Sequence, residues 1–422
     1  MIIPIPYGKT QLELRLPDDL DVTVLDPRET PPAPDPVRAV REAIEAADWS
    51  SFAGARTAAI AINDKTRPVP HDILLPPLLE KLEALGMAPD RITLVIATGC
   101  HAPMTPDEFP GILPESIIAR YRVVSHNVED EANIIRLGLT KRRTVVSVNR
   151  TYFDANLRLV VGNVEPHQFA GFSGGVKSAV IGLTSWDTIN GNHRLMSEPG
   201  ATLGSYEENP LRQDIEDMGR VVGVHMALNT VLNRQKQIVK VFCGPPLNVM
   251  RTAIPLVRQV YELPIEHPFD LVIVSPGGYP KDINIYQGQK AMGHAALVTR
   301  PGGAIIMVAA CAEGSGSQKY EAWLAKLPPD ERNSEAVIAR FRREGFRVGP
   351  HKAFQIARDS AGRRVIWVTD LPNPDYFMLE HARSLDEALS RVLPEYGNGR
   401  IGVIPYGNAT IPTLRRGEPV QP

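Results

Sequence analysis

Short apolar runs alternate along the chain with longer segments whose apolar positions recur at helical spacing. The strand-like runs are residues 57–62, 92–97, 157–161, 271–274 and 304–309. The helix-like segments are residues 35–49, 72–85, 185–196, 211–222 and 287–298. Runs that are apolar throughout are typical of strands buried on both faces. Their alternation with helices predicts an α/β fold with largely parallel sheets flanked by helices.

The length of the chain predicts two domains. Its 422 residues exceed what one hydrophobic core usually serves. A proline-rich segment, residues 263–268, precedes a fresh strand. It separates an N-terminal domain, residues 1–265, from a C-terminal domain, residues 268–396. Residues 397–422 suit either domain, and residues 2–16 have the alternation of a hairpin.

The composition excludes several classes of protein. Hydrophobic residues are 43% and charged residues 22%, as in ordinary folded proteins, and the net charge of -2 favours neither nucleic acid nor an anionic membrane as a partner. No apolar run reaches the ~18–20 residues of a membrane helix. The three cysteines are far apart and form neither a disulfide framework nor a zinc pattern. We therefore expect a cytoplasmic protein.

Four loops after predicted strands are rich in reactive side chains. They are residues 63–68, 98–101, 166–177 and 277–282. Taken singly, each has an ordinary explanation: Asp64 and Arg67 can form a local ion pair, and His101 or His193 can be a loop or helix-end histidine. Parallel strands, however, place their carboxyl ends at one edge, where α/β proteins bind ligands. Four such loops at that edge favour a functional site.

The glycine-rich loop approximates a phosphate-binding loop without matching it. Residues 171–178 read Gly-Phe-Ser-Gly-Gly-Val-Lys-Ser, but Val176 stands where the pattern G-x-x-x-x-G-K-[ST] requires its second glycine. This mismatch argues against a nucleoside triphosphatase. Backbone N–H groups of such a loop can still face an anion, which leaves a phosphate-bearing cofactor open.

Several separated segments together resemble the nickel-dependent lactate racemases. They are residues 64–68, 97–101, 167–177, 191–193 and 277–290, in that order. The spacing of His167, Lys177 and His193 is also similar to that of the family. The resemblance extends over nearly the whole chain, and agreement of several ordered motifs is more specific than any single glycine pattern.

The resemblance implies a cofactor and roles for particular residues. The cofactor is the nickel-pincer nucleotide, a mononucleotide derived from nicotinic acid, covalently linked through Lys177 and with His193 as a nickel ligand. His101 and His167 match the two acid/base histidines. The residues implied for cofactor contact are Asp64, Lys65, Thr66, Arg67, Gly174, Gly175, Lys177 and His193. Those implied for substrate contact are Arg67, Tyr286, Gln287, Lys290 and His351.

These roles are chemically consistent with a racemase or epimerase that inverts C2 of a 2-hydroxy acid. Removal of a proton from C2 beside a carboxylate would give a poorly stabilised dianion. Transfer of hydride to the cofactor, with a histidine taking the hydroxyl proton, gives a 2-keto acid instead. Two histidines, one for each enantiomer, explain a pair such as His101 and His167. Arg67 or Lys290 can hold the carboxylate.

The chain departs from the family pattern at two positions. His351 aligns where lactate-specific members have a tryptophan over the substrate, and Val176 precedes Lys177 where they have an arginine. A histidine is smaller than tryptophan and forms hydrogen bonds. The substrate is thus lactate or a larger or more polar 2-hydroxy acid, such as malate or an aldonate. In the alternative without a role for His351 in substrate binding, His351 faces solvent and Phe354 closes the pocket.

Two other functions remain open at this stage. A nicotinamide-dependent hydroxy-acid dehydrogenase requires a G-x-G-x-x-G turn, which the sequence lacks. A non-catalytic nickel or nucleotide carrier requires Lys177 and His193 but has no use for His101 and His167. For the racemase, the expected partners are the small hydroxy acid and the enzymes that make the cofactor. We expect the active site in the cleft between the two domains.

Overall fold

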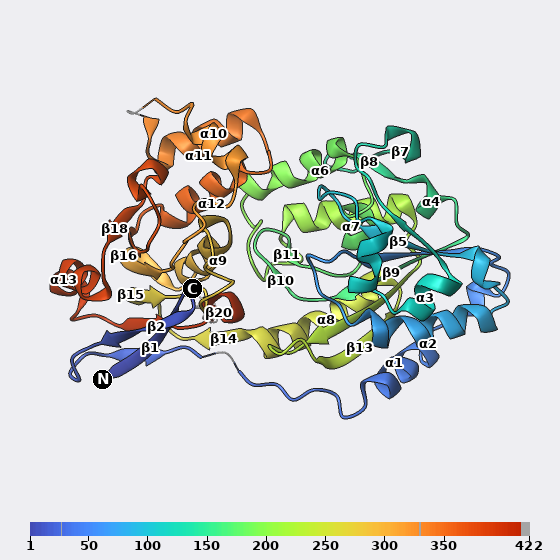
Figure 1. Cartoon of the computed structure of the whole chain (residues 1–422), viewed down its shortest axis with the longest axis horizontal. Coiled ribbons are helices and arrows are strands. Elements are labelled where there is room, and N and C mark those ends of the chain that lie inside the picture. Colours follow the sequence, from blue (N-terminus) through green and yellow to red (C-terminus); the bar gives the residue numbers. More distant parts are fainter. Residues whose placement is uncertain (27, 329–330, 415–422) are drawn as a thin grey trace, which may run out of the picture. The chain divides into compact units, whose positions relative to one another are not determined.

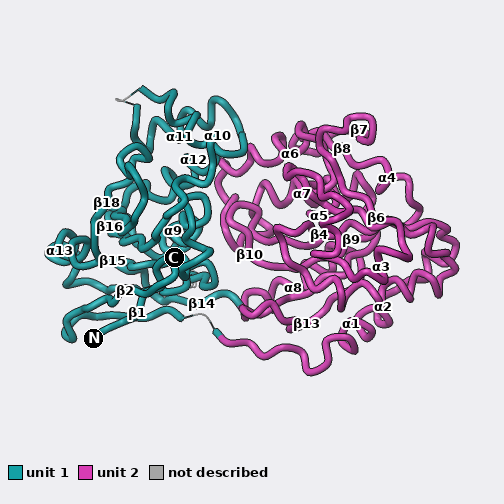
Figure 2. Tube along the Cα trace, in the orientation of Figure 1, with its two compact units in different colours: residues 1–28, 261–422 teal, residues 29–260 magenta. Residues whose placement is uncertain are grey.

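The computed structural model describes the chain apart from residue 27, residues 329–330 and residues 415–422. It divides into two compact units, which Figures 1 and 2 show: unit 1 contains Met1–Arg28 and Tyr261–Pro422, and unit 2 contains Glu29–Val260. Each unit has its own six-stranded sheet. None of the helices in the described residues is both long and apolar enough to cross a membrane.

The six-stranded sheet of unit 2 is parallel except at one edge. In spatial order it contains β13 (Ile238–Gly244), β12 (Met226–Leu232), β9 (Leu157–Asn163), β4 (Ala58–Asn63), β5 (Ile92–Ala97) and β6 (Arg122–Ser125). Only β13 is antiparallel to its neighbour. The apolar runs expected at 57–62, 92–97 and 157–161 are confirmed as β4, β5 and β9, which are adjacent.

Helices and short strands surround this sheet. The helices are α1 (Pro36–Glu45), α2 (His71–Ala84), α3 (Glu115–Arg120), α4 (Arg150–Phe153), α5 (Lys177–Val180), α6 (Trp186–His193), α7 (Pro210–Val222) and α8 (Pro246–Tyr261). The short strands form two antiparallel pairs, β7 (Ile134–Leu139) with β8 (Val145–Asn149) and β10 (Pro166–His167) with β11 (Gly171–Phe172). Apolar residues of α1 and α2 pack with those of β4, β5 and β9 in one core. Asp35 caps α1 by accepting from the Arg38 N–H.

The sheet of unit 1 is parallel throughout. In spatial order it contains β18 (Glu380–Ala382), β17 (Arg364–Val368), β16 (Thr299–Val308), β15 (Phe269–Val274), β19 (Ile401–Ile404) and β3 (Val22–Val24). Two further strands of the unit, β14 (Glu262–Ile265) and β20 (Ile411–Leu414), form a separate parallel pair.

Two cores cover the two faces of this sheet. Along β15, Val272 and Val274 pack into one core, and Leu271 and Ile273 pack into the other, because successive side chains of a strand point to opposite faces. The first core includes residues of α9 (Ile285–Ala296), α10 (Gln318–Leu324), α11 (Ser334–Glu344) and α12 (Pro350–Ser360). The second includes residues of α13 (Leu385–Tyr396), β1 (Ile2–Tyr7) and β2 (Thr10–Arg15).

The division of the chain differs from the one expected at its N-terminus. Residues 1–28 belong to unit 1 and not to the domain that follows them, because β3 pairs with β19 and the hairpin buries Ile5 and Leu14 in the second core of unit 1. The hairpin itself is confirmed. The strand expected at 400–404 lies in unit 1 as β19. That an active site lies between the two units stays a prediction.

Candidate active site

Three of the four reactive loops leave the same edge of the unit 2 sheet. The adjacent parallel strands β4, β5 and β9 end at Asn63, Ala97 and Asn163, and the loops that carry Asp64, His101 and the glycine-rich segment begin there. The fourth loop follows β15 of unit 1 and leads into α9. The structure therefore brings the three loops of unit 2 together and places the fourth loop in unit 1.

His101 is oriented by a buried carboxylate. Its Nδ1–H donates to Asp64 Oδ2 at 2.7 Å, and Asp64 is only 2% exposed. Asp64 Oδ1 accepts from the Thr66 backbone N–H at 3.1 Å and from the Thr66 hydroxyl at 2.6 Å. Burial raises the pKa of Asp64, but the hydrogen bonds from His101 and Thr66 outweigh it and the pKa is lowered. A neutral His101 therefore carries its proton on Nδ1 and presents the lone pair of Nε2.

The remaining charged residues of this loop are exposed. Lys65 forms an ion pair with Glu108, and Arg67 lies at the surface. The charge of Arg67 nevertheless lowers the pKa of both Lys177 and His193. Arg67 is thus close enough to these two groups to attract an anion bound beside them.

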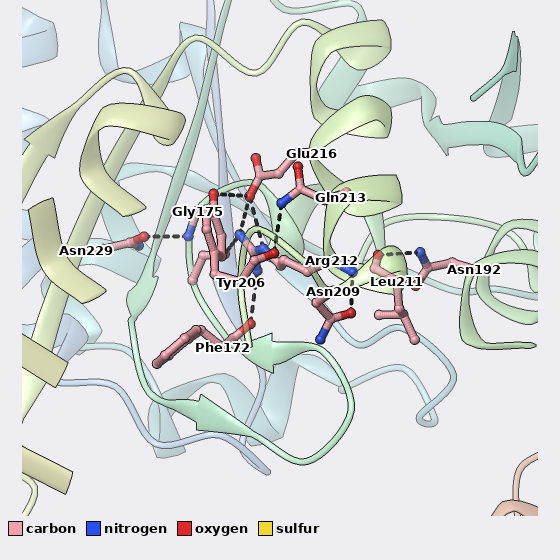
Figure 3. Close-up of polar contacts among 11 residues, drawn as sticks. Phe172, Gly175, Asn192, Tyr206, Asn209, Leu211, Arg212, Gln213, Glu216 and Asn229 are labelled. Carbon is pink, nitrogen blue, oxygen red and sulfur yellow. Dashed lines mark hydrogen bonds and ion pairs between the residues drawn. The ribbon is translucent and has the colours of Figure 1, made fainter. Parts of the chain in front are cut away.

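A buried arginine fixes the glycine-rich loop, as Figure 3 shows. The guanidinium of Arg212, on α7, is fully buried and donates to the carbonyl of Phe172 at 3.0 Å and to that of Gly174 at 3.1 Å. On the other side of the loop, the N–H of Gly175 donates to Asn229 Oδ1 at 2.7 Å. Gly174 and Gly175 have φ of +85° and +58°, where other residues are strained.

Arg212 is itself neutralised inside the unit. Glu216, one turn further along α7, accepts from Arg212 at 2.6 Å and also from the hydroxyl of Tyr206 at 2.8 Å. The start of α7 is capped by Asn209, whose Oδ1 accepts from the Arg212 N–H at 3.0 Å. A buried charge pair with all these hydrogen bonds holds the loop in one conformation.

Lys177 begins α5 directly after this loop and is 6% exposed. Burial lowers the pKa of Lys177 well below its ordinary value, and the positive charges of Arg67 and Arg212 lower it further. A neutral lysine amine is a nucleophile, whereas a protonated one is not. The environment of Lys177 therefore suits a covalent link to a cofactor.

His193 is the last residue of α6, and its ring is oriented by a chain of buried polar groups. Its Nδ1–H donates to Asn192 Oδ1 at 3.1 Å. The amide nitrogen of Asn192 donates to the Leu211 carbonyl and to Asp214 Oδ2, which fixes which end of the amide faces His193. Asp214 accepts in turn from Thr140. The lone pair of neutral His193 is therefore on Nε2.

These features fit a metal that brings most of its own ligands. Burial, together with the charges of Lys177 and Arg67, lowers the pKa of His193 to about 3, so the ring stays neutral and able to coordinate. An imidazole held through its other nitrogen is the usual arrangement of a metal-binding histidine. The described residues contain no cluster of three or more His, Cys, Asp or Glu that could hold a metal ion alone. A single protein ligand suits nickel carried by an organic cofactor.

In neutral His167 the ring proton lies on the other nitrogen from that in His101. Its Nδ1 accepts from the Ala170 backbone N–H at 3.2 Å, so the proton of the neutral ring is on Nε2. Its ring packs edge-on against Phe169 at 4.7 Å between centroids, and Phe169 packs in the same way against His193 at 5.2 Å. Phe169 thus contacts the rings of both His167 and His193.

The candidate substrate residues of unit 1 lie on two packed helices. Tyr286, Gln287 and Lys290 occupy the first turns of α9, where Lys290 Nζ donates to Gln287 Oε1 at 2.6 Å. His351, on α12, is 5% exposed, and its ring centroid lies 5.7 Å from that of Tyr286. The alternative in which His351 faces solvent is therefore wrong. Phe354 stacks on Phe341 of α11 at 4.6 Å, within the core.

Sequence reasoning overlooked four residues that contact or position these groups. They are Phe169, Asn192, Arg212 and Lys352. Phe169 and Asn192 lie inside the matching segments beside the residues singled out, and contain no separate signal. Arg212 had one, since Arg and Glu at positions 212 and 216 lie on the apolar face of a predicted helix. Lys352 follows His351 directly and gave no signal in the sequence.

Comparison with known proteins agrees in both halves of the chain. Residues 7–204 match the lactate racemase N-terminal domain, and residues 265–411 match the lactate racemase C-terminal domain. The lactate racemase of Lactiplantibacillus plantarum is 32% identical over 367 residues, which cover 85% of this chain and 85% of that protein. The lactate racemase of Thermoanaerobacterium thermosaccharolyticum is 31% identical over 424 residues, covering 97% of this chain and 98% of that protein.

Solved structures show the same relationship. The lactate racemase apoprotein from Thermoanaerobacterium thermosaccharolyticum superimposes with a TM-score of 0.86 at 29% identity, covering 99% of this chain and 100% of that one. A protein from Thermotoga maritima shares the fold, with a TM-score of 0.62 at 16% identity over 90% of this chain and 97% of that one. The chain therefore belongs to the lactate racemase family, a family of isomerases.

Proposed function

We propose that this protein is a racemase or epimerase that inverts C2 of a 2-hydroxy acid, either lactate or a more polar relative. The observation that carries the proposal is that two histidines in one unit hold the ring proton on different nitrogens. His101 presents a proton acceptor at Nε2, and His167 presents a proton donor at Nε2. Relatives named lactate racemase, similar over most of the chain, support this assignment.

We also propose the nickel-pincer nucleotide as the cofactor, with Lys177 as its covalent attachment and His193 as a nickel ligand. When bound, this group supplies the acceptor and then the donor of the C2 hydride. Lys177 contributes a neutral buried amine, and His193 contributes an oriented Nε2 lone pair. Asp64, Lys65, Thr66, Gly174 and Gly175 complete the proposed contacts. The cofactor would come from separate maturation enzymes in the cytoplasm.

The protein's own residues account for the movement of protons. His101 takes the hydroxyl proton on Nε2 as the substrate becomes a 2-keto acid, and buried Asp64 stabilises the imidazolium that forms. His167 in its neutral state donates a hydrogen bond from Nε2 to the substrate oxygen, delivers a proton only as the imidazolium, and accepts one at Nε2 only after its ring proton has shifted to Nδ1. The two directions of the reaction are therefore expected to begin from different protonation states.

The substrate carboxylate is assigned to cationic side chains of the matching segments. Arg67 can bind a carboxylate through two N–H groups, and Lys290 offers a single ammonium whose position is set by Gln287. Tyr286 and His351 pack edge-on against each other and would contact the rest of the substrate.

The test is a racemisation screen of the protein produced together with the maturation enzymes. Intact mass and nickel analysis should show a covalent adduct, and one enantiomer of lactate, malate or an aldonate should become a mixture. Lys177→Ala should remove the adduct, and His193→Ala should lower nickel retention, because each removes one attachment. The matched controls are Lys141→Ala and His267→Ala, which alter exposed residues of the same types.

Two results would contradict the proposal. Full activity with unchanged nickel content in both Lys177→Ala and His193→Ala would remove the cofactor assignment. A loaded protein that racemises none of the hydroxy acids would instead favour a carrier.

A further inference from the structure

A buried lysine lies beside the candidate substrate residues of unit 1. Lys352, on α12, is only 3% exposed, and its Nζ lies 4.4 Å from the centre of the Tyr286 ring on α9. Lys290, one helical turn after Tyr286, is close enough for its charge to lower the pKa of Lys352. Two amines on two packed helices are therefore close enough to repel each other, and one of them lies over the Tyr286 ring.

Lys352 forms no ion pair with any described carboxylate, although the charge of Asp359 acts on it from the same helix. Its side-chain amine forms no hydrogen bond and no ion pair with any described residue, and the Tyr286 ring is the one aromatic ring there over which it lies. Asp359, on the same helix, pairs instead with Arg358 at 2.7 Å. Long charged side chains are almost never fully buried unless they are paired. An anion that binds beside these two amines would offset both their mutual repulsion and the cost of burying Lys352 without an ion-pair partner.

We propose that Lys352, together with Lys290 and Tyr286, binds a second carboxylate of the substrate, so that the preferred substrate is a 2-hydroxy dicarboxylate such as malate. This inference rests on the proposed function and names its substrate class. Lactate has one carboxylate, for which Lys290 or Arg67 suffices. The hydroxyl groups of an aldonate are neutral and would not favour the protonated form of Lys352, as a second carboxylate does.

The electrostatics of the helix pair support this substrate class. Burial lowers the pKa of Lys352 well below its ordinary value, and Lys290 and Arg358 lower it further, while Asp359 opposes them. A carboxylate beside the amine favours the protonated form and raises the pKa again. Binding of malate is therefore expected to take up a proton and to weaken as the pH rises, whereas binding of lactate is not.

The experiment is calorimetric titration of the full chain, as isolated, with malate, lactate and succinate. The variants are Lys352→Met, Lys352→Arg and, as the matched control, Lys240→Met, which removes an exposed lysine over Phe242 in unit 2. Lys352→Met should weaken malate binding about tenfold or more, and leave lactate binding nearly unchanged, since it removes one ionic contact that only the dicarboxylate makes. Lys352→Arg should retain part of the preference, and Lys240→Met all of it.

The outcomes separate this inference from the proposed function. Equal changes for malate and lactate, or no change, would overturn the role of Lys352 even in a protein that racemises lactate well. A preference for malate that Lys352→Met abolishes would support it even in a protein that racemises neither acid. Loss of nickel from Lys352→Met with an unchanged preference would assign the amine to the cofactor and also overturn the inference. Because a buried unpaired lysine contributes little to folding, Lys352→Met should unfold no earlier than the parent, and Lys352→Gln is the second variant.

Discussion

The two units hold their candidate functional residues in different ways. In unit 2 these residues are on loops or at the ends of short helices, and buried partners fix them: Asp64 fixes His101, Asn192 fixes His193, and Arg212 fixes the glycine-rich loop. In unit 1 they are on α9 and α12, where packing of rings and stems positions Tyr286 and His351.

This difference suggests that unit 2 serves proton transfer and unit 1 serves substrate recognition. Hydrogen-bonded partners determine which nitrogen of a histidine carries the proton, which is a requirement of proton transfer. A side chain on a helix face, in contrast, can be replaced by another without moving the backbone, which suits recognition of different substrates. We therefore expect substitutions in unit 2 to reduce activity on every substrate, and substitutions in unit 1 to change the order of substrates.

The largest effect is expected for Asp64→Asn. The variant amide can donate to Nδ1 of His101, which moves the ring proton to Nε2 and blocks its lone pair, so kcat should fall by about 10²–10⁴. The fall should be similar for every hydroxy acid, with little change in KM. The measurement is the initial rate from each enantiomer, and the control is Asp72→Asn, an exposed carboxylate at the start of α2. An unchanged kcat would remove the chemical role of unit 2.

Arg212→Met tests whether a buried network supports the loop. Glu216 would be left as a buried charge without its partner, so the free energy of unfolding should fall by about 3–5 kcal/mol, and Lys177 should lose its fixed position. Chemical denaturation measures the first effect. Arg220→Met, an exposed arginine of the same helix paired with Asp217, is the control and should cost under ~1 kcal/mol.

A second variant shows whether the loss arises from charge. If Arg212→Met is destabilising because Glu216 is left unpaired, the double variant that combines Arg212→Met with Glu216→Leu should recover part of the stability, because it leaves no buried charge at either position. A double variant no more stable than Arg212→Met would mean that the hydrogen bonds to Phe172 and Gly174 dominate.

The sequence predicted the sheets better than the way the chain is divided between them. Strands such as β4, β5 and β15 are apolar throughout, and strands buried on both faces leave that signal. The placement of residues 1–28 in unit 1 had no local signal, because the pairing of β3 with β19 joins segments that are far apart in the chain. A strand of three residues is also too short for periodicity to identify.

The candidate site shows the same limit. The loops were predictable because they follow recognisable strands, and three of them do lie at one edge of unit 2. The partners that orient them were harder to predict: Asn192 and Arg212 act through contacts between distant segments, and only the place of Arg212 on the apolar face of a helix left a signal. His351 was expected beside the substrate residues, and its contact with Tyr286 agrees, although its role stays a prediction.

A pH titration of stability sharpens the comparison further. Burial lowers the pKa of His71 and of His126 in unit 2 to about 4 each. Because the folded pKa is below that of the unfolded chain, the unfolded state binds more protons, and stability is lost as the pH falls from about 6.5 toward 4. Each histidine should cost roughly 2 kcal/mol between pH 7 and 5.

Urea unfolding at several pH values measures this loss. His126→Gln should reduce the dependence on pH, whereas His267→Gln, at an exposed position, should leave it unchanged. In unit 1, burial also lowers the pKa of His294, but hydrogen bonds to the carbonyls of Gly407 and Thr410 oppose the shift. A steeper loss in unit 1 than in unit 2 would contradict this assignment.

The smallest effect is expected for His351→Trp, and it falls on choice of substrate. His351 accepts from the Gly349 N–H at 3.1 Å through Nδ1, so its Nε2–H is a donor that tryptophan would replace with a different geometry. The larger ring can keep the contacts with Tyr286 and Phe346, but it fills space beside Lys352. The efficiency for malate relative to lactate should therefore fall by about tenfold, near 1.4 kcal/mol, with kcat for lactate little changed. The measurement is kcat/KM for both acids in the parent and the variant, with Phe354→Leu as a control that changes a core ring stacked on Phe341. If lactate is already preferred by a wide margin and the ranking does not move, recognition does not depend on α12, and the division between the two units is wrong at this point.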